Sequence, residues 1–173
     1  LKLMESKENL VFLGMMGSGK TSIGTIVSKK LKLSFFDIDQ LIENDQQMRV
    51  SKIFETKGEI YFREIEKKIT LNTLKNEKGV IALGGGAFIN KAIKKEVLEN
   101  HLSFWLNWDN NTLINRIKNS KKRPLAYNLS KLELIEIIKK RSTIYSKALY
   151  KINCNNFTKQ EIAKQVINLY EAH

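Results

Sequence analysis

The sequence predicts an α/β fold in which one parallel sheet is flanked by helices. Short apolar runs, such as residues 10–13 and 79–83, alternate with longer segments of helical periodicity, which is typical of βα units. A glycine-rich loop joins the first apolar run to the first helical segment, an arrangement typical of phosphate-binding loops. At 173 residues the chain has the size of one domain, which buries roughly 70% of its unfolded surface. We therefore expect a single domain over residues 1–173.

The glycine-rich loop is the strongest local signal. Residues 14–21 fill every fixed position of the pattern G-x-x-x-x-G-K-[ST], and an amphipathic run over 21–31 follows them. Its glycines let backbone N–H groups converge on an anion at the N-terminus of a helix, which carries about half a positive charge. Lys20 adds a mobile ammonium for the outer phosphates, and the Thr21 hydroxyl is placed to bind Mg²⁺. The pattern predicts a nucleotide site rather than a chance turn.

The amino-acid composition limits the kinds of protein and partner that the chain is compatible with. Cys154 is the single cysteine, so an internal disulfide is excluded. No apolar run of about 18 residues and no signal-peptide pattern occurs, which leads us to expect a reduced, soluble, cytoplasmic protein without a membrane partner. The net charge of +12 is compatible with a nucleic acid or a small anion as partner. Lysines scattered over solvated helix faces explain the charge equally well, and we favour that interpretation.

Two carboxylates end the second predicted strand. Residues 33–39 have strand character, and Asp37 and Asp39 would point to the same side if the strand continues that far. Ligands of open α/β sheets bind outside the carboxyl ends of the strands, so both acids are aimed at the edge of the phosphate loop. One is expected to face Mg²⁺ and the other an acceptor substrate. The alternative is a pair of surface acids at a turn.

A long helical region follows, with a predicted break at Gly58. Residues 41–75 are more than a simple crossover needs, so they predict a subdomain that holds something other than the nucleotide. Arg63 lies among aromatic residues there, and Glu66 is three residues later, within reach of the guanidinium. The alternative for Arg63 is an exposed surface charge. The strand at 79–83 then runs into a triple glycine that allows close approach of a small substrate to the backbone.

The rest of the chain supplies a basic loop and the remaining βα units. Residues 118–128 predict a mobile lid, in which Pro124 favours an extended Arg123 that reaches the transferring phosphoryl group. A solvated charge run or a weak nucleic-acid patch is the alternative. Arg141 and Tyr145 share a helix face, and Trp105 and Trp108 are interpreted as core or boundary aromatics. The other expected elements are helices at 91–99, 110–117, 131–150 and 158–170 and strands at 101–106 and 150–154.

These motifs together resemble the shikimate kinases, a family of nucleoside monophosphate kinase-like P-loop enzymes. The resemblance covers nearly the whole chain. It implies a three-layer P-loop kinase fold with a five-stranded parallel sheet of order 2-3-1-4-5. It also implies a helical substrate-binding insertion at about 39–75 and a lid at about 118–128. The implied reaction transfers the γ-phosphoryl of ATP to the 3-hydroxyl of shikimate with Mg²⁺, in aromatic amino acid (chorismate) biosynthesis, by a monomer with no nucleic-acid partner.

The resemblance also implies roles for individual residues. Lys20, Asp39 and Arg123 would be catalytic, and Thr21 and Asp37 would hold Mg²⁺, the latter through water. Residues that would bind the nucleotide are Gly17, Ser18, Gly19, Lys20, Thr21, Ser22, Arg116 and Arg123. Residues that would bind shikimate are Asp39, Phe54, Phe62, Arg63, Gly84, Gly85, Gly86 and Arg141.

The chain departs from the family pattern at a few positions. Thr21-Ser22 replaces the usual Ser-Thr, which keeps the hydroxyl for Mg²⁺. Ala126 replaces a larger apolar residue, and residues 153–157 lack the proline expected near adenine. Rival hypotheses are another small-molecule kinase, acting on gluconate or a nucleoside monophosphate, and a basic nucleic-acid-binding protein. No guanine-recognition N-K-x-D pattern and no RNA- or DNA-binding signature is present.

Overall fold

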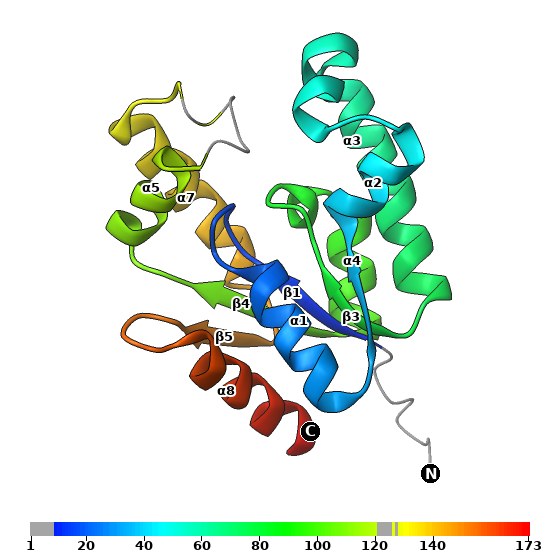
Figure 1. The fold of residues 1–173 in the computed structure, drawn as a ribbon, viewed down its shortest axis with the longest axis vertical. Coiled ribbons are helices and arrows are strands. Elements are labelled where there is room, and N and C mark those ends of the chain that lie inside the picture. Colours follow the sequence, from blue (N-terminus) through cyan, green and yellow to red (C-terminus); the bar gives the residue numbers. More distant parts are fainter. Residues whose placement is uncertain (1–8, 121–125, 127) are drawn as a thin grey trace.

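The computed structural model describes residues 9–120, 126 and 128–173. Its centre is a five-stranded parallel sheet with the strand order β2-β3-β1-β4-β5 (Figure 1). This order confirms the predicted fold class. The strands are β1 (Leu10–Leu13), β2 (Ser34–Asp37), β3 (Gly79–Ala82), β4 (Leu102–Asn107) and β5 (Tyr150–Asn153). The helices are α1 (Lys20–Leu31), α2 (Ile38–Gln46), α3 (Val50–Asn76), α4 (Lys91–Asn100), α5 (Asn110–Lys118), α7 (Lys131–Tyr145) and α8 (Lys159–Glu171).

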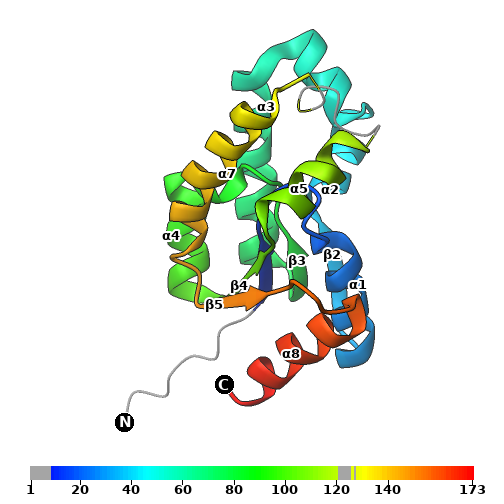
Figure 2. The same cartoon turned by 90° about the vertical axis from the view of Figure 1, so that its left-hand side faces the viewer.

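Strand alternation creates one hydrophobic core on each face of the sheet. On β1, Leu10 and Phe12 point towards α1 and α8, whereas Val11 and Leu13 point towards the helices of the opposite face. All four side chains are buried, as expected for a parallel strand covered on both sides. Figure 2 shows this layering, with α4 and α7 on one side of the strands and α1 on the other. The burial anchors the central strand whose end carries the phosphate loop.

Parallel pairing brings the ends of several strands to one edge of the sheet. Leu13, the last residue of β1, pairs with Trp105 of β4, and Phe12 pairs with Ala82 of β3. Asp37, the last residue of β2, also pairs with Ala82. The phosphate loop, the triple glycine and Asp37 therefore gather at the carboxyl edge of the sheet, where ligands of open α/β sheets bind.

The second strand is shorter than predicted, and this corrects the expectation for Asp39. β2 ends at Asp37, and α2 begins at the next residue. Asp37 caps α2, because its side chain accepts a hydrogen bond from the backbone N–H of Gln40 at 3.3 Å. Asp39 consequently lies in the first turn of a helix rather than on a strand beside Asp37.

The predicted break in the long helical region is present, whereas the helix before β5 ends earlier than predicted. α3 contains the predicted break, since Gly58 has φ 84° and ψ 171° inside an otherwise continuous helix. A side chain at this positive φ would be strained, so glycine is suited to the position. α7 ends at Tyr145 rather than near residue 150, and a turn separates it from β5. No described helix is long and apolar enough to cross a membrane.

Candidate active site

The phosphate loop is held by its own lysine. Gly17 and Gly19 adopt φ values of +77° and +85°, which glycine tolerates and which turn the loop into the N-terminus of α1. The Lys20 ammonium donates to the carbonyls of Gly14 at 2.7 Å and Met15 at 2.9 Å. Lys20 is 7% exposed, so these contacts satisfy a largely buried cation and tie the helix start back to the end of β1.

A hydroxyl and a carboxylate meet beside this loop. Thr21 Oγ1 donates to Asp37 Oδ2 at 2.6 Å, so the two residues predicted to hold Mg²⁺ are adjacent. Both are hard oxygen ligands, which fit the preference of Mg²⁺. Among the described residues no group of three or more histidine, cysteine or acidic side chains is placed to bind a metal. Mg²⁺ commonly needs one or two protein oxygens because water and phosphate oxygens complete its shell.

A second part of this edge is organised around the triple glycine, where two carboxylates converge. A Cβ atom placed on Gly84 would lie 2.8 Å from Glu66 Oε2 and 3.0 Å from Asp39 Oδ1. The glycine therefore leaves the space that these two oxygens border. Asp39 comes from the first turn of α2 and Glu66 from α3, so the helical insertion supplies both.

Arg63 lies in the same group and is paired with a buried partner. Its Nη1 donates to Glu66 Oε1 at 2.8 Å, and its Nε lies 3.6 Å from the more exposed Glu59. The Glu66 side chain is 3% exposed and that of Arg63 is 35% exposed, so Arg63 is half-buried and paired rather than an exposed surface charge. A Cβ on Gly86 would lie 2.6 Å from Arg63 Nη1, so glycine there makes room for the guanidinium.

Two phenylalanines lie beside this guanidinium. The carbon of the Arg63 guanidinium lies 5.3 Å from the ring centroid of Phe62 and 6.0 Å from that of Phe54. The two rings are themselves in contact, with centroids 4.5 Å apart. Phe62 is buried and Phe54 is half-buried. The electron-rich faces of these rings favour a cation held beside them.

The burial of Glu66 perturbs its ionisation. Burial raises the pKa of the Glu66 carboxyl above its usual value, and the Arg63 guanidinium opposes this rise. The nearby Asp39 carboxylate raises the pKa further, while Arg141 lowers it. A cluster of two carboxylates and two guanidiniums at one place is typical of a functional site, although structural ion pairs also perturb pKa values.

α7 brings the second guanidinium to the triple glycine. Arg141 Nη1 donates to the Gly85 carbonyl at 3.5 Å, a long hydrogen bond. One turn later, the Tyr145 hydroxyl donates to the same carbonyl, and it also lies 4.0 Å from the sulfur of Met15 in the phosphate loop. The sequence indicated the shared face of these two residues but gave no role to Tyr145. The structure shows that it joins the triple glycine to the phosphate loop.

The ionisation of Tyr145 predicts a pH effect on stability. Burial raises the pKa of Tyr145 to about 12, against the opposing effect of Arg141. Between pH 10 and pH 12 the unfolded chain loses the phenolic proton while the folded chain keeps it. The free energy of unfolding should therefore fall as pH rises through this window, by up to roughly 3 kcal/mol from this group.

Urea unfolding of the chain and of Tyr145→Phe, compared from pH 8 to pH 11.5, checks this expectation. The stability advantage of the chain over Tyr145→Phe should be largest at pH 8 and should shrink above pH 10. Parallel loss of stability in both proteins would contradict a proton held by Tyr145.

The opposite flank of the phosphate loop is formed by α5. Arg116 Nη1 donates to the Gly17 carbonyl at 3.1 Å, and its guanidinium carbon lies 4.0 Å from the ring centroid of Trp108. The indole N–H of Trp108 donates to the Ser18 carbonyl at 2.8 Å. Trp105 is buried and Trp108 is half-buried against both cores, so the interpretation of both as core or boundary aromatics is confirmed, but Trp108 also stacks with Arg116, which was not predicted. The position of Trp108 just after β4 was the available signal.

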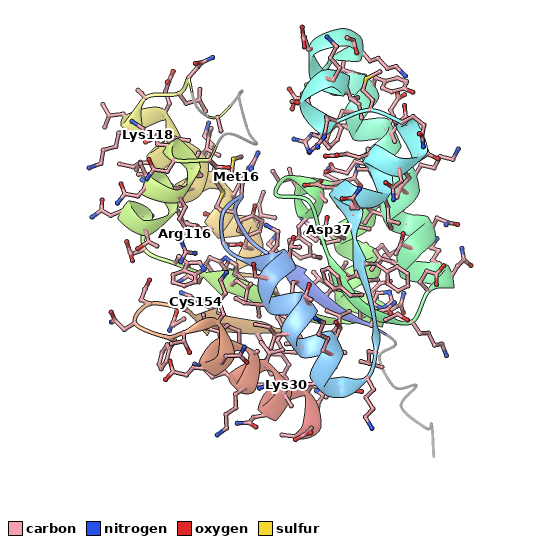
Figure 3. All side chains as sticks on the ribbon, in the orientation of Figure 1. Met16, Lys30, Asp37, Arg116, Lys118 and Cys154 are labelled. Atoms are coloured by element: carbon pink, nitrogen blue, oxygen red, sulfur yellow. The ribbon has the colours of Figure 1, made fainter. Side chains whose placement is uncertain are left out.

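Of the remaining predicted site residues, Ser22 is described by the structure and Arg123 is not. Ser22 Oγ accepts a hydrogen bond from Lys159 of α8 at 3.3 Å, so α8 also contacts the start of α1. Arg123 and most of the predicted lid lie outside the described residues. Figure 3 labels Met16 of the phosphate loop, Arg116 of α5 and Asp37 of β2 around the carboxyl edge of the sheet.

Comparison with known proteins decides the family. The shikimate kinase family model matches residues 16–171. The chain belongs to the shikimate kinase family. A shikimate kinase of Bartonella henselae is 40% identical over 169 residues, which cover 96% of this chain and 80% of that protein. The shikimate kinase of Bacillus subtilis is 37% identical over 169 residues, covering 93% of this chain and 88% of that one.

Comparison with solved structures gives the same family. A shikimate kinase from Acinetobacter baumannii, in complex with shikimate, superposes with a TM-score of 0.90 at 26% identity, covering 97% of this chain and 95% of that one. A deoxyadenosine kinase from M. mycoides shares the fold alone, with a TM-score of 0.64 at 18% identity. As a shikimate kinase family member the chain is an ATP-dependent kinase, and its motifs occupy one edge of the sheet.

Proposed function

We propose that this chain transfers the γ-phosphoryl group of ATP to the 3-hydroxyl of shikimate, giving shikimate 3-phosphate and ADP. The observation that carries the proposal is the meeting of Arg63, Arg141 and Asp39 at the triple glycine, beside the phosphate loop. Guanidiniums pair with a carboxylate through two parallel hydrogen bonds, and a carboxylate accepts hydrogen bonds from hydroxyls. Shikimate offers both kinds of group.

The proposed roles divide between nucleotide and acceptor. Gly17, Gly19, Lys20 and neighbouring loop residues would bind the phosphates, with Ser22 at the start of α1 and Arg116 beside the base. Arg63 and Arg141 would bracket the shikimate carboxylate, and Phe54 and Phe62 would wall the acceptor site. Asp39 would accept hydrogen bonds from ring hydroxyls and take the proton of the reacting one. The backbone of Gly84 to Gly86 would contact the acceptor directly.

Mg²⁺ belongs to the proposal as the ion held by Thr21 and, through water, by Asp37. When bound, it would neutralise charge on the phosphate oxygens. Arg123 would reach the transferring group from the lid at about 118–128. Phosphoryl transfer asks the protein mainly for positioning and charge stabilisation, and these residues supply both. We further propose a cytoplasmic monomer with no nucleic-acid partner.

The test is an ADP-release assay on the purified chain. ADP should form only when ATP, Mg²⁺ and shikimate are all present. Both the phosphate loop and the cluster of Asp39, Arg63 and Arg141, here called the acceptor cluster, must be occupied for transfer to occur. Gluconate and nucleoside monophosphates serve as matched acceptors. An assay that stays flat with shikimate but responds to one of these acceptors would refute the proposed substrate. Omission of Mg²⁺, with excess chelator, should abolish turnover.

A further inference from the structure

The carbonyl groups of the phosphate loop need partners of their own. Its N–H groups have to face an anion, so the carbonyls point away from it and must find other donors. The carbonyls of Gly14 and Met15 accept from Lys20, and that of Gly19 accepts the N–H of Ile23 at 2.9 Å. These three carbonyls are satisfied from within the loop and α1.

The two carbonyls at the tip of the loop take donors from another part of the chain. The Gly17 carbonyl accepts from Arg116, and the Ser18 carbonyl accepts from Trp108, about 90 residues further along the sequence. Ser18 itself is fully buried, so a missing donor at its carbonyl would leave a polar group poorly satisfied. The orientation of the loop tip therefore depends on the segment between β4 and α5.

Trp108 contributes to both of these contacts. Its indole N–H makes the 2.8 Å bond to Ser18, and its ring carries the guanidinium of Arg116 at 4.0 Å. Trp108 is half-buried and packs against both hydrophobic cores of the sheet, and this packing holds its ring in place. Arg116 is exposed, so the face of its guanidinium that does not contact the indole is open to solvent.

The loop backbone is shaped to accept this arrangement. A Cβ on Gly17 would lie 3.3 Å from the Cβ of Arg116, so the close approach of α5 to the loop favours glycine there. Figure 3 shows Arg116 on α5 next to the loop that carries Met16. The indole of Trp108, its N–H group and Gly17 therefore form one contact between the segment after β4, α5 and the phosphate loop.

We propose that Trp108 is a positioning residue for nucleotide binding. Its N–H fixes the Ser18 carbonyl, which orients the loop N–H groups, and its ring holds the Arg116 guanidinium in place for the base. The inference rests on the proposed function in one respect, that the loop binds an adenine nucleotide. It adds a residue that touches neither substrate and acts through the loop and Arg116.

Two variants separate the two contacts. Trp108→Phe keeps a ring for Arg116 and removes the donor, so the dissociation constant of ADP with Mg²⁺ should rise about three- to tenfold. Trp108→Leu removes donor and ring together, and the rise should reach about ten- to a hundredfold. The matched control is Trp105→Phe, which changes a buried tryptophan on β4, the strand that ends just before Trp108, and it should leave ADP affinity unchanged.

Calorimetry with ADP and no acceptor measures these constants, and steady-state assays provide a second readout. KM for ATP should rise in Trp108→Phe while KM for shikimate stays the same, because the acceptor cluster lies on the other side of the loop. A residue with a merely structural role would lower the melting temperature without this split between the two substrates.

Fluorescence gives an independent measurement, since the chain has two tryptophans. In Trp105→Phe the remaining indole is Trp108, and its emission should change when ADP binds. In Trp108→Phe the remaining indole is Trp105, and its emission should change far less. The emission of Trp108 itself can be measured even if Trp108→Phe fails to fold, because it needs only Trp105→Phe.

The possible outcomes separate a failure of the proposed function from a failure of the role assigned to Trp108. An unaltered chain that binds no ADP would overturn the proposed function and this inference with it. A chain that binds ADP normally, with a folded Trp108→Phe of equal affinity, would overturn the inference alone. Trp108 emission that ignores ADP in Trp105→Phe would do the same.

Discussion

Arg63→Ala is expected to weaken shikimate binding by about a hundred- to several-thousandfold while ADP affinity stays near normal. Arg63 is one of two guanidiniums at the triple glycine, and in the proposed site its removal would leave the shikimate carboxylate under-paired. Arg63→Lys should rescue poorly, because an ammonium cannot make two parallel hydrogen bonds to a carboxylate. Calorimetry with shikimate, and separately with ADP, measures both affinities.

The partner of Arg63 makes a control for folding necessary. Arg63→Ala also leaves the buried Glu66 without its ion pair, so some loss of melting temperature is expected. The double variant Arg63→Ala/Glu66→Gln should regain melting temperature without regaining shikimate affinity. Arg49→Ala is the matched surface control, since the Arg49 side chain is 81% exposed on the same insertion. Near-normal shikimate affinity in Arg63→Ala would place the acceptor site elsewhere.

Asp39→Asn is expected to lower kcat by about 10²- to 10⁴-fold, the range typical of a lost general base. The amide keeps the size of the side chain and can still contact hydroxyls, but it cannot take up a proton at neutral pH. ADP affinity should be unchanged, because Asp39 lies on the acceptor side of the edge. Single-turnover kinetics with saturating shikimate separates this loss from weaker binding.

Asp45→Asn is the matched control for Asp39, since it changes an exposed carboxylate on the same helix. It should leave turnover and shikimate affinity unchanged. A folded Asp39→Asn that turns over at the normal rate would remove Asp39 from the chemistry and leave it, at most, a binding residue.

Much of the site could be predicted because local motifs dictate it. Residues 14–21 have one well-known conformation at the end of a strand, and the structure has it, with positive φ at Gly17 and Gly19. The strand order came from the family resemblance rather than from periodicity. Arg63, Arg141 and the triple glycine are brought together as the resemblance implied.

The remainder depended on contacts that periodicity does not encode. Asp39 was expected on a strand because Asp37 was not recognised as a helix cap, although capping ends β2 and starts α2. Glu66 is buried beside the glycine segment that follows β3, a tertiary contact that periodicity along the helix cannot reveal. Trp108 meets Ser18 through a tertiary hydrogen bond that spans 90 residues of sequence.

The break at Gly58 divides α3 into an outer part, residues 50–57, and an inner part, residues 59–76, which carry different residues of the proposed site. The outer part carries Phe54, a wall of the proposed acceptor site, and the inner part carries Arg63 and Glu66, which pair within it. Because the backbone turns at Gly58, the outer part can change in sequence or length without rotating the inner helix about its axis. A change within residues 50–57 can therefore alter the wall at Phe54 while the Arg63–Glu66 ion pair on the inner part stays in place.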